Sequence, residues 1–124
     1  MSNYPDSQDR VLVKNYMELL PLLDLLQDNI NAIDSNFRLP HIFKAHLLSL
    51  MDTVTKEQTD IRKSMRVRGI RIYEEGRKNG KTFCKYQVRG YHEDFGILDG
   101  VLKARVEERL ATYLGIDITD IERN

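Results

Sequence analysis

Hydrophobic residues in the first third of the chain recur at helical spacing. They stand alternately four and three residues apart, at Leu12, Tyr16, Leu19, Leu23, Leu26, Ile30 and Ile33. This heptad pattern predicts one long helix, for which Asp6 or Ser7 is the expected N-cap. Pro21 removes a backbone hydrogen bond inside it, but the pattern keeps its phase across the proline. We therefore expect a kinked helix rather than two helices.

A second helical pattern begins at Pro40, because proline is favourable in the first turn of a helix. Its apolar positions are Phe43, Leu47, Leu50, Val54, Ile61 and Met65. The connection between the two patterns is short, so the helices should be antiparallel neighbours. The sequence thus predicts a helical hairpin over residues 10–66, preceded by a flexible arm over residues 1–9.

At Gly69 the period changes from helical to alternating. The segments GIRIYEE and FCKYQVR both alternate, and Asn79-Gly80 between them is a strong hairpin signal. A two-residue turn would place the apolar Ile72 opposite Gln87. A three-residue loop with Gly80 in a bulge pairs Ile72 with Tyr86 instead, which makes one face apolar, and we expect this register. Its outer face would carry Arg71, Tyr73, Glu75, Phe83, Lys85, Gln87 and Arg89.

A third helix is expected after the hairpin, with Asp99 as its N-cap. Leu102, Val106 and Leu110 line one side of it, and Gly115 is a natural stop with a Schellman contact to the next residue. The predicted fold is therefore α+β, a single domain over residues 1–124. It comprises the long antiparallel helical hairpin, a two-stranded basic β-hairpin over 67–91, and a C-terminal helix and tail over 92–124. A lone two-stranded ribbon needs a cover, either this helix or a second subunit.

Length and composition favour an ordinary globular protein. The chain has 124 residues, of which 41% are hydrophobic and 31% charged, and this fits one domain with its own core. A single cysteine, Cys84, excludes an internal disulfide and favours a reducing, cytoplasmic setting. No apolar run approaches the roughly 18 residues of a membrane span, and the N-terminus lacks the pattern of a signal peptide.

The net charge is zero, but it is unevenly distributed along the chain. Residues 62–89 hold ten Lys or Arg and two Asp or Glu, a net of +8, whereas residues 1–61 and 90–124 each carry −4. Such a basic centre would attract an external polyanion. The acidic ends of the same chain, or of a second copy, would neutralise it equally well.

The basic segment supplies the candidate binding residues. Cations there would meet phosphates and aromatics would stack on bases, at Arg66, Arg68, Arg71, Tyr73, Phe83, Lys85 and Arg89. The alternative is a solvated hairpin, since strands carry Lys and Arg for solubility and against edge pairing. The chain has no RNA-recognition aromatic motif and no zinc-finger spacing.

The stretch LLPLLDLL, residues 19–26, is apolar on more than one helical face. The heptad seam leaves Leu20, Leu22 and Leu25 in need of another surface. The sheet and third helix of the same chain would cover them, or a second subunit would, giving a homodimer.

Residues for catalysis are sparse, so we expect no catalytic site, no metal and no cofactor. His41 and His46 are five residues apart on a helix and do not share a face, and Cys84 is expected to be an inert core thiol. The first functional hypothesis is a small non-enzymatic interaction or regulatory protein that self-associates through its helices and binds an anionic partner such as nucleic acid. The second is an adaptor whose basic hairpin meets an acidic protein surface. An enzyme with an unrecognised site around His92, Glu93 and Tyr113 is the third.

Overall fold

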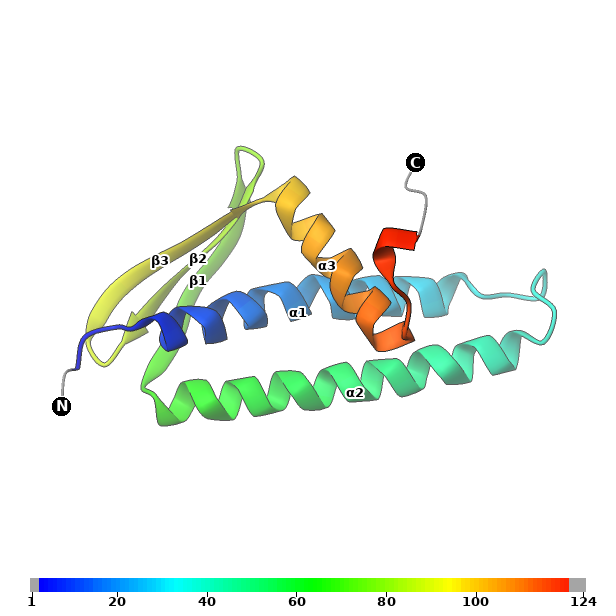
Figure 1. Cartoon of the computed structure of the whole chain (residues 1–124), viewed down its shortest axis with the longest axis horizontal. Helices are drawn as coiled ribbons and strands as arrows, with labels where there is room; N and C mark the ends of the chain where they lie inside the picture. Colours follow the sequence, from blue (N-terminus) through cyan, green and yellow to red (C-terminus); the bar gives the residue numbers. More distant parts are fainter. Residues whose placement is uncertain (1–2, 121–124) are drawn as a thin grey trace.

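The computed structural model describes residues 3–120. Its elements are α1 (Ser7–Ala32), α2 (Pro40–Val67), β1 (Ile70–Lys78), β2 (Lys81–Val88), β3 (Tyr91–Leu98), α3 (Asp99–Leu114) and a short 3₁₀ turn, η1 (Ile118–Asp120). Figure 1 shows α1 and α2 side by side as a long antiparallel hairpin, with the sheet at one end and α3 packed across α1. The α+β class of the prediction is confirmed.

The sheet differs from the prediction because it has three strands, in the order β1-β2-β3, all antiparallel. Residues 91–98, which we expected to lead into a helix, form β3 instead. The turn between β2 and β3 is Arg89-Gly90, with φ of 47° and 92°. These angles match a two-residue type I′ turn, whose twist suits antiparallel strands.

The expected register between β1 and β2 is correct for Ile70 and Ile72 but wrong beyond Tyr73, and its expected cause is wrong. Ile70 pairs with Val88 and Ile72 with Tyr86, as burial requires. The connection is nevertheless the tight Asn79-Gly80 turn, with Lys78 paired to Lys81, and the extra residue is Tyr73, in a bulge inside β1. The bulge reverses the facing of the strand beyond it, so Glu75 pairs with Cys84 on the inner face rather than lying outside.

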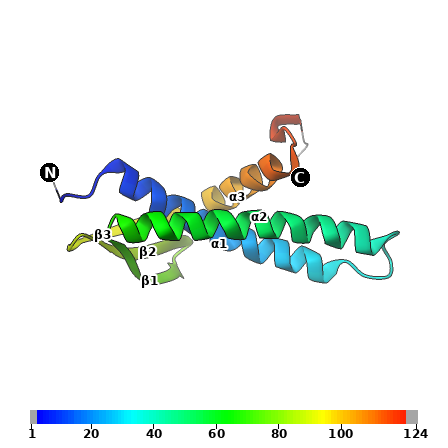
Figure 2. The same ribbon diagram turned by 90° about the horizontal axis from the view of Figure 1, so that it is seen from below.

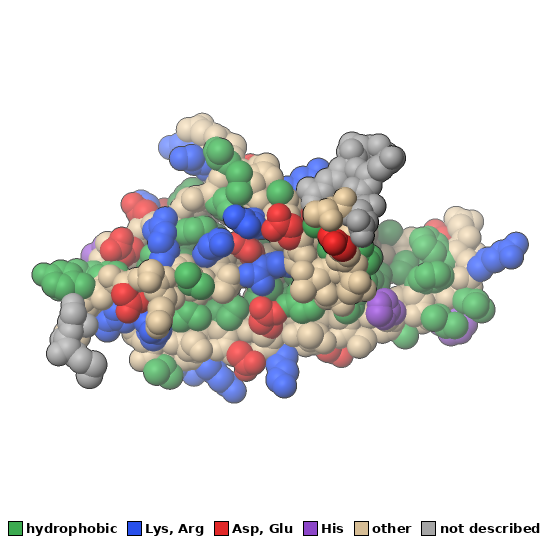
Figure 3. Space-filling view, viewed as in Figure 1, with side chains coloured by type: hydrophobic (Ala, Val, Ile, Leu, Met, Phe, Trp, Pro, Cys, Tyr) green, Lys and Arg blue, Asp and Glu red, His purple; other side chains and the backbone are tan. Residues whose placement is uncertain are grey.

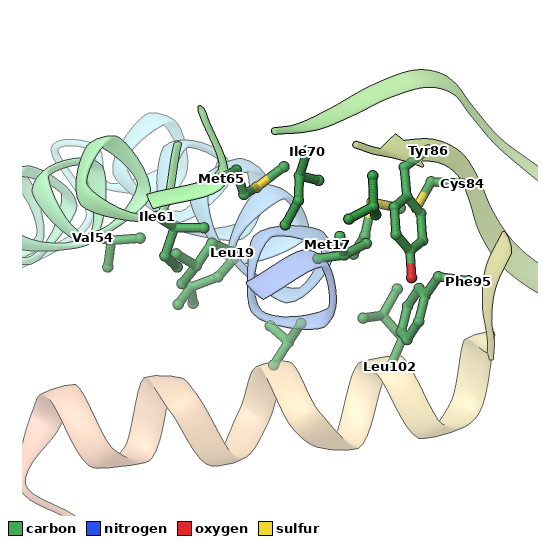
Figure 4. Packing of buried hydrophobic residues seen from close by; sticks show 14 of the residues in the cluster. Met17, Leu19, Val54, Ile61, Met65, Ile70, Cys84, Tyr86, Phe95 and Leu102 are labelled. Atoms are coloured by element: carbon green, nitrogen blue, oxygen red, sulfur yellow. The ribbon is translucent and has the colours of Figure 1, made fainter. Parts of the chain in front are cut away.

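The hydrophobic core lies where α1 passes between α2, α3 and the inner face of the sheet. Figure 4 shows Met17 and Leu19 of α1 among Val54, Ile61 and Met65 of α2, with Ile70, Cys84, Tyr86, Phe95 and Leu102 completing the cluster. Leu22, Leu19 and Val54 are fully buried. The ribbon that needed a cover is thus covered by the helices of its own chain.

Helix α1 runs through Pro21 without a break, as the unbroken heptad phase predicted. It begins at Ser7, with Asp6 as N-cap in a reciprocal capping box with Asp9. The flexible arm expected over residues 1–9 is therefore wrong for Asp6 to Asp9, and Asp9 is fully buried. In α2, Phe43 is exposed rather than packed in the seam, while Gln58 occupies a buried position between Val54 and Ile61.

The two ends of α3 follow the prediction in part. Ile116 N–H donates to Ala111 O at 2.8 Å and Gly115 N–H to Thr112 O at 3.1 Å, which is the expected Schellman arrangement. Asp99 does not cap α3, because β3 runs directly into the helix and Leu98 takes the N-cap position. None of the described helices combines the length and apolarity needed to cross a bilayer.

Candidate functional site: the outer face of the sheet

The outer face of the sheet is turned away from the helices. Figures 1 and 2 show α1, α2 and α3 arranged along the opposite, inner side of β1, β2 and β3. The pairing places these side chains together on the outer face: Arg71, Glu74, Phe83, Lys85, Gln87, His92 and Asp94. Arg71, Lys85 and His92 are exposed, and Phe83 and Gln87 are half-buried. We call this surface, with Tyr73, the outer face.

Tyr73 spans the sheet because the bulge aims it across β2. Its hydroxyl lies 3.2 Å from His92 Nδ1, on the far edge strand. The two rings meet edge to face, with centroids 5.7 Å apart and planes at 82°. The sheet therefore presents an aromatic pair that bridges both edge strands, and the tyrosine remains half exposed.

Phe83 lies between two glycines at the other end of the outer face. It pairs with Gly76 on β1 and with Gly96 on β3. A Cβ atom at Gly76 would lie only 3.0 Å from Phe83 Cζ, so the ring rests on the bare backbone of β1. An aromatic ring supported in this way is a flat stacking surface.

Cations on and around the outer face are partly neutralised. Lys85 Nζ lies 3.6 Å from Glu74, and Arg71 Nη2 donates to Gln87 Oε1 at 3.5 Å. At the hairpin tip, Arg77 Nη2 donates to Asp99 at 2.9 Å, and this hydrogen bond lowers the pKa of the Asp99 carboxyl. Arg66 is exposed on α2, where it extends the cationic surface beyond the sheet.

Two of the predicted polyanion-binding residues belong to a structural ion cluster instead. Asp9 Oδ1 accepts from Arg68 Nη1 at 2.7 Å, and its Oδ2 accepts from Arg89 Nη2 at 2.7 Å. Arg89, expected on the outer face, lies in the β2–β3 turn and also donates to the carbonyls of Asn3 and Tyr4. Because both guanidinium groups satisfy a buried carboxylate, Arg68 and Arg89 are removed from the candidate interface.

The electrostatics of Asp9 follow from this geometry. Burial alone raises the pKa of its carboxyl, but the hydrogen bonds from Arg89, from the Asp6 backbone N–H and from Arg68 outweigh burial. The net result is a pKa well below the ordinary value of 3.8. Asp9 is therefore ionised, and the N-terminus of α1 is fixed to the end of α2 and to the sheet.

A second ion cluster joins the three helices. Arg109 of α3 donates to Glu18 Oε1 at 2.8 Å, to Asn15 Oδ1 at 2.7 Å and to Glu57 Oε1 at 3.4 Å. Lys14 Nζ lies 3.8 Å from the other oxygen of Glu18, which is buried. These groups line a cavity of about 410 Å³ that carries as many cations as carboxylates, so its net charge is zero.

The predicted self-association residues are divided between core and surface. Leu22 is fully buried within the chain and is unavailable to a second copy, which corrects that prediction. Leu20 and Leu25 are half-buried and line an open groove of about 640 Å³ between α1, α3 and the tip of β1-β2.

The residues considered for chemistry are dispersed. Among the described residues no three His, Cys, Asp or Glu side chains come together as a metal site would require. His41 and His46 are exposed in the first two turns of α2, whereas His92 lies on β3. Cys84 lies on the inner face, where burial raises the pKa of its thiol to about 12. Cys84 therefore lies in the core, as the alternating pattern of FCKYQVR predicted.

These features define a class: a small α+β protein with a three-stranded antiparallel sheet, one face of which is covered by helices while the other is exposed. The family model described as YhjD protein matches residues 4–118, so the chain belongs to the YhjD protein family. The match spans all three long helices and the whole sheet. No curated protein and no solved structure matched the chain.

Proposed function

We propose that this protein is a small, non-enzymatic interaction protein that binds single-stranded nucleic acid through its outer face and self-associates through its helices. The observation that carries the first part is the row of aromatic side chains on the outer face. Tyr73, Phe83 and His92 come from three different strands. Stacking on such side chains is sequence-tolerant and contributes about 1–3 kcal/mol per base.

Charge supports the same partner. Arg71 and Lys85 lie beside the aromatic row, and Lys78 and Lys81 are exposed at the β1–β2 turn. Backbone phosphates would approach these cations while bases lie on the rings, as in other single-strand binding surfaces. A single strand is the better fit, because its bases are free to stack on a flat face whereas those of a duplex are not. The proposed cytoplasmic setting rests on the single cysteine alone.

The ion pairs around the outer face favour a second candidate. Lys85 is paired with Glu74 and Arg77 with Asp99, which weakens the field that a polyanion would feel. An adaptor that binds an acidic protein surface would need fewer free cations than a phosphate-binding protein. Binding to poly-glutamate without binding to DNA supports this adaptor.

The test is a fluorescence anisotropy titration with short single- and double-stranded DNA at about 50 and 200 mM salt, because counterion release makes phosphate contacts strongly salt-dependent. The proposal expects tighter binding of the single strand and a steep loss of affinity with salt. Tyr73→Ala and Phe83→Ala should each weaken single-strand binding by about tenfold.

Lys85→Glu should also weaken binding, whereas the same change at Lys56, exposed on α2 away from the sheet, should leave it unaltered. Equal binding of both DNA forms with no effect of the aromatic variants would contradict stacking on the outer face. Absence of binding at the lower salt would overturn the nucleic-acid proposal altogether.

A further inference from the structure

An apolar groove with an acidic rim lies beside the helical hairpin. Met17, Leu20, Pro21 and Leu25 of α1 form one part of its floor, and Leu102 and Val106 of α3 form another. Its volume of about 640 Å³ is within the usual range of binding clefts and holds several large side chains. Its lining is more apolar than polar, so large apolar side chains would fit it.

The groove carries more negative than positive charge. Four carboxylates line it, those of Asp24, Glu75, Asp99 and Glu107, against the two cations Arg77 and Lys103. Arg77 and Asp99 pair with each other, so the net charge of −2 rests with the other lining groups. A partner that combines large apolar side chains with cations would therefore complement both its floor and its rim.

The tip of the helical hairpin has the complementary composition. Five large apolar side chains are 45–60% exposed there: Phe37, Leu39, Ile42, Phe43 and Leu48. Figure 3 shows hydrophobic side chains gathered at this end of the molecule, with histidines beside them. Residues 35–51 include Arg38 and Lys44 but no Asp or Glu.

Leu39 adds a second observation at the tip. Its φ is 53°, in the left-handed region, where a leucine is strained relative to the right-handed conformation. The side chain is also the most exposed of the five apolar residues. A strained and exposed leucine is unfavourable in an isolated chain, and strain of this kind gathers at functional positions.

The tip cannot enter the groove of its own chain. The groove is centred near Pro21, and α1 continues for eleven more residues to Ala32, about 17 Å at 1.5 Å per residue, before the tip begins. The continuous helix holds the two surfaces apart, so the occupant of the groove must be another molecule.

We propose that the hairpin tip of one copy docks into the groove of a second copy. Two such contacts made reciprocally give a closed two-fold dimer, in which both apolar surfaces are covered. Phe37 and Phe43, whose rings already meet edge to face at 6.0 Å, supply the apolar anchor, and Arg38 and Lys44 face the acidic rim. This inference rests on the self-association part of the proposed function but is independent of nucleic-acid binding.

The experiment is sedimentation-velocity ultracentrifugation of the full chain over a concentration series, with two variants that alter exposed residues. Phe43→Glu disables the tip, and the double change Asp24→Arg with Glu75→Arg disables the groove. Phe43→Glu should raise the dimer dissociation constant by about tenfold or more, since burial of one large apolar side chain is worth that much. The groove variant should also raise it, because its new arginines repel Arg38 and Lys44 of the docking tip. An equal mixture of the two variants should recover dimers, because one intact tip still meets one intact groove.

Two further variants separate association from folding. Leu39→Gly relieves the left-handed strain, so it should weaken the dimer while the unfolding midpoint of the monomer stays the same or rises. Val67→Glu, at a residue 87% exposed at the other end of α2, should change neither property.

Three results of these measurements would overturn the proposal. A chain that stays monomeric throughout the series overturns both this proposal and the self-association part of the proposed function. Dimers that resist the tip and groove variants overturn this proposal alone. Loss of dimers only in the tip variant, without recovery on mixing, indicates a tip-to-tip contact and also overturns it.

Discussion

Arg89 Nη2 lies 2.7 Å from Asp9 Oδ2, although the two residues are 80 positions apart in the chain. The same guanidinium donates to the carbonyl of Arg68 at 2.6 Å through its other terminal nitrogen. One side chain therefore joins the start of α1, the end of α2 and the turn between β2 and β3. This contact holds the sheet on the helices at one end of the molecule.

Replacing Asp9 with asparagine should destabilise the fold by about 3 kcal/mol, because it leaves two guanidinium groups around a neutral buried side chain. Urea unfolding followed by circular dichroism measures the change. Asp6→Asn is the matched control: asparagine still caps the helix, and the Asp6–Arg68 pair is exposed, so the loss should stay below about 1 kcal/mol. Similar losses in both variants would contradict the central role of Asp9.

Stability should also fall at acid pH in a way that depends on Asp9. The pKa of Asp9 in the folded state is lowered below the ordinary value of 3.8. Its contribution to the free energy of unfolding is therefore complete above pH 3.8, and it is lost as the pH falls from 3.8 toward the folded-state pKa. Unfolding midpoints at about pH 7 and about pH 3 should therefore differ more in the natural chain than in Asp9→Asn. Parallel pH profiles of the two proteins would show that other carboxylates cause the acid sensitivity.

Phe83 and Gly76 should be energetically coupled. A methyl group at position 76 would meet the Phe83 ring at 3.0 Å, so Gly76→Ala should displace the ring and cost about 1 kcal/mol. In a Phe83→Ala background the same methyl group has room, and the cost should vanish. A double-mutant cycle of unfolding free energies measures the coupling, and additive effects would place the ring elsewhere.

Cys84 should be unreactive in the native protein. Its thiol is buried, and its pKa is raised to about 12, whereas only the exposed thiolate is a good nucleophile. Reaction with a chromogenic disulfide reagent should proceed at the rate of opening of the core, and at once in denaturant. Fast reaction under native conditions would show that the inner face of β2 is accessible.

The helical part of the fold could be predicted from the sequence because its information is local. The heptad spacing from Leu12 to Ile33 and the proline at position 40 define α1 and α2 within a few residues. The pairing of Ile72 with Tyr86 could also be predicted, since only one register buries an apolar face. The position of the bulge could not be predicted. One extra residue in β1 at Tyr73 and one extra residue in the turn produce the same pairing of Ile70 and Ile72.

The third strand was missed for an identifiable reason. Arg89 takes a left-handed conformation that its residue type disfavours, so Arg89-Gly90 is a weaker turn signal than Asn79-Gly80. The alternation of Tyr91, Glu93, Phe95 and Ile97 was the available signal for β3. His92 joined the outer face only once that strand was placed. The Asp9 cluster unites residues from distant parts of the chain, and nothing in their local sequence indicates that they meet.

The far half of the helical hairpin is supported by the rest of the molecule at one end only. Ile30, Ile33 and Leu50 are buried there, yet they lie outside the main hydrophobic cluster. Beyond the reach of α3 and the sheet, each helix is supported by the other alone, so amide protons in this half should exchange with solvent by local opening well before those of the core. The free end should therefore open locally more often than the sheet and its anchoring ion cluster.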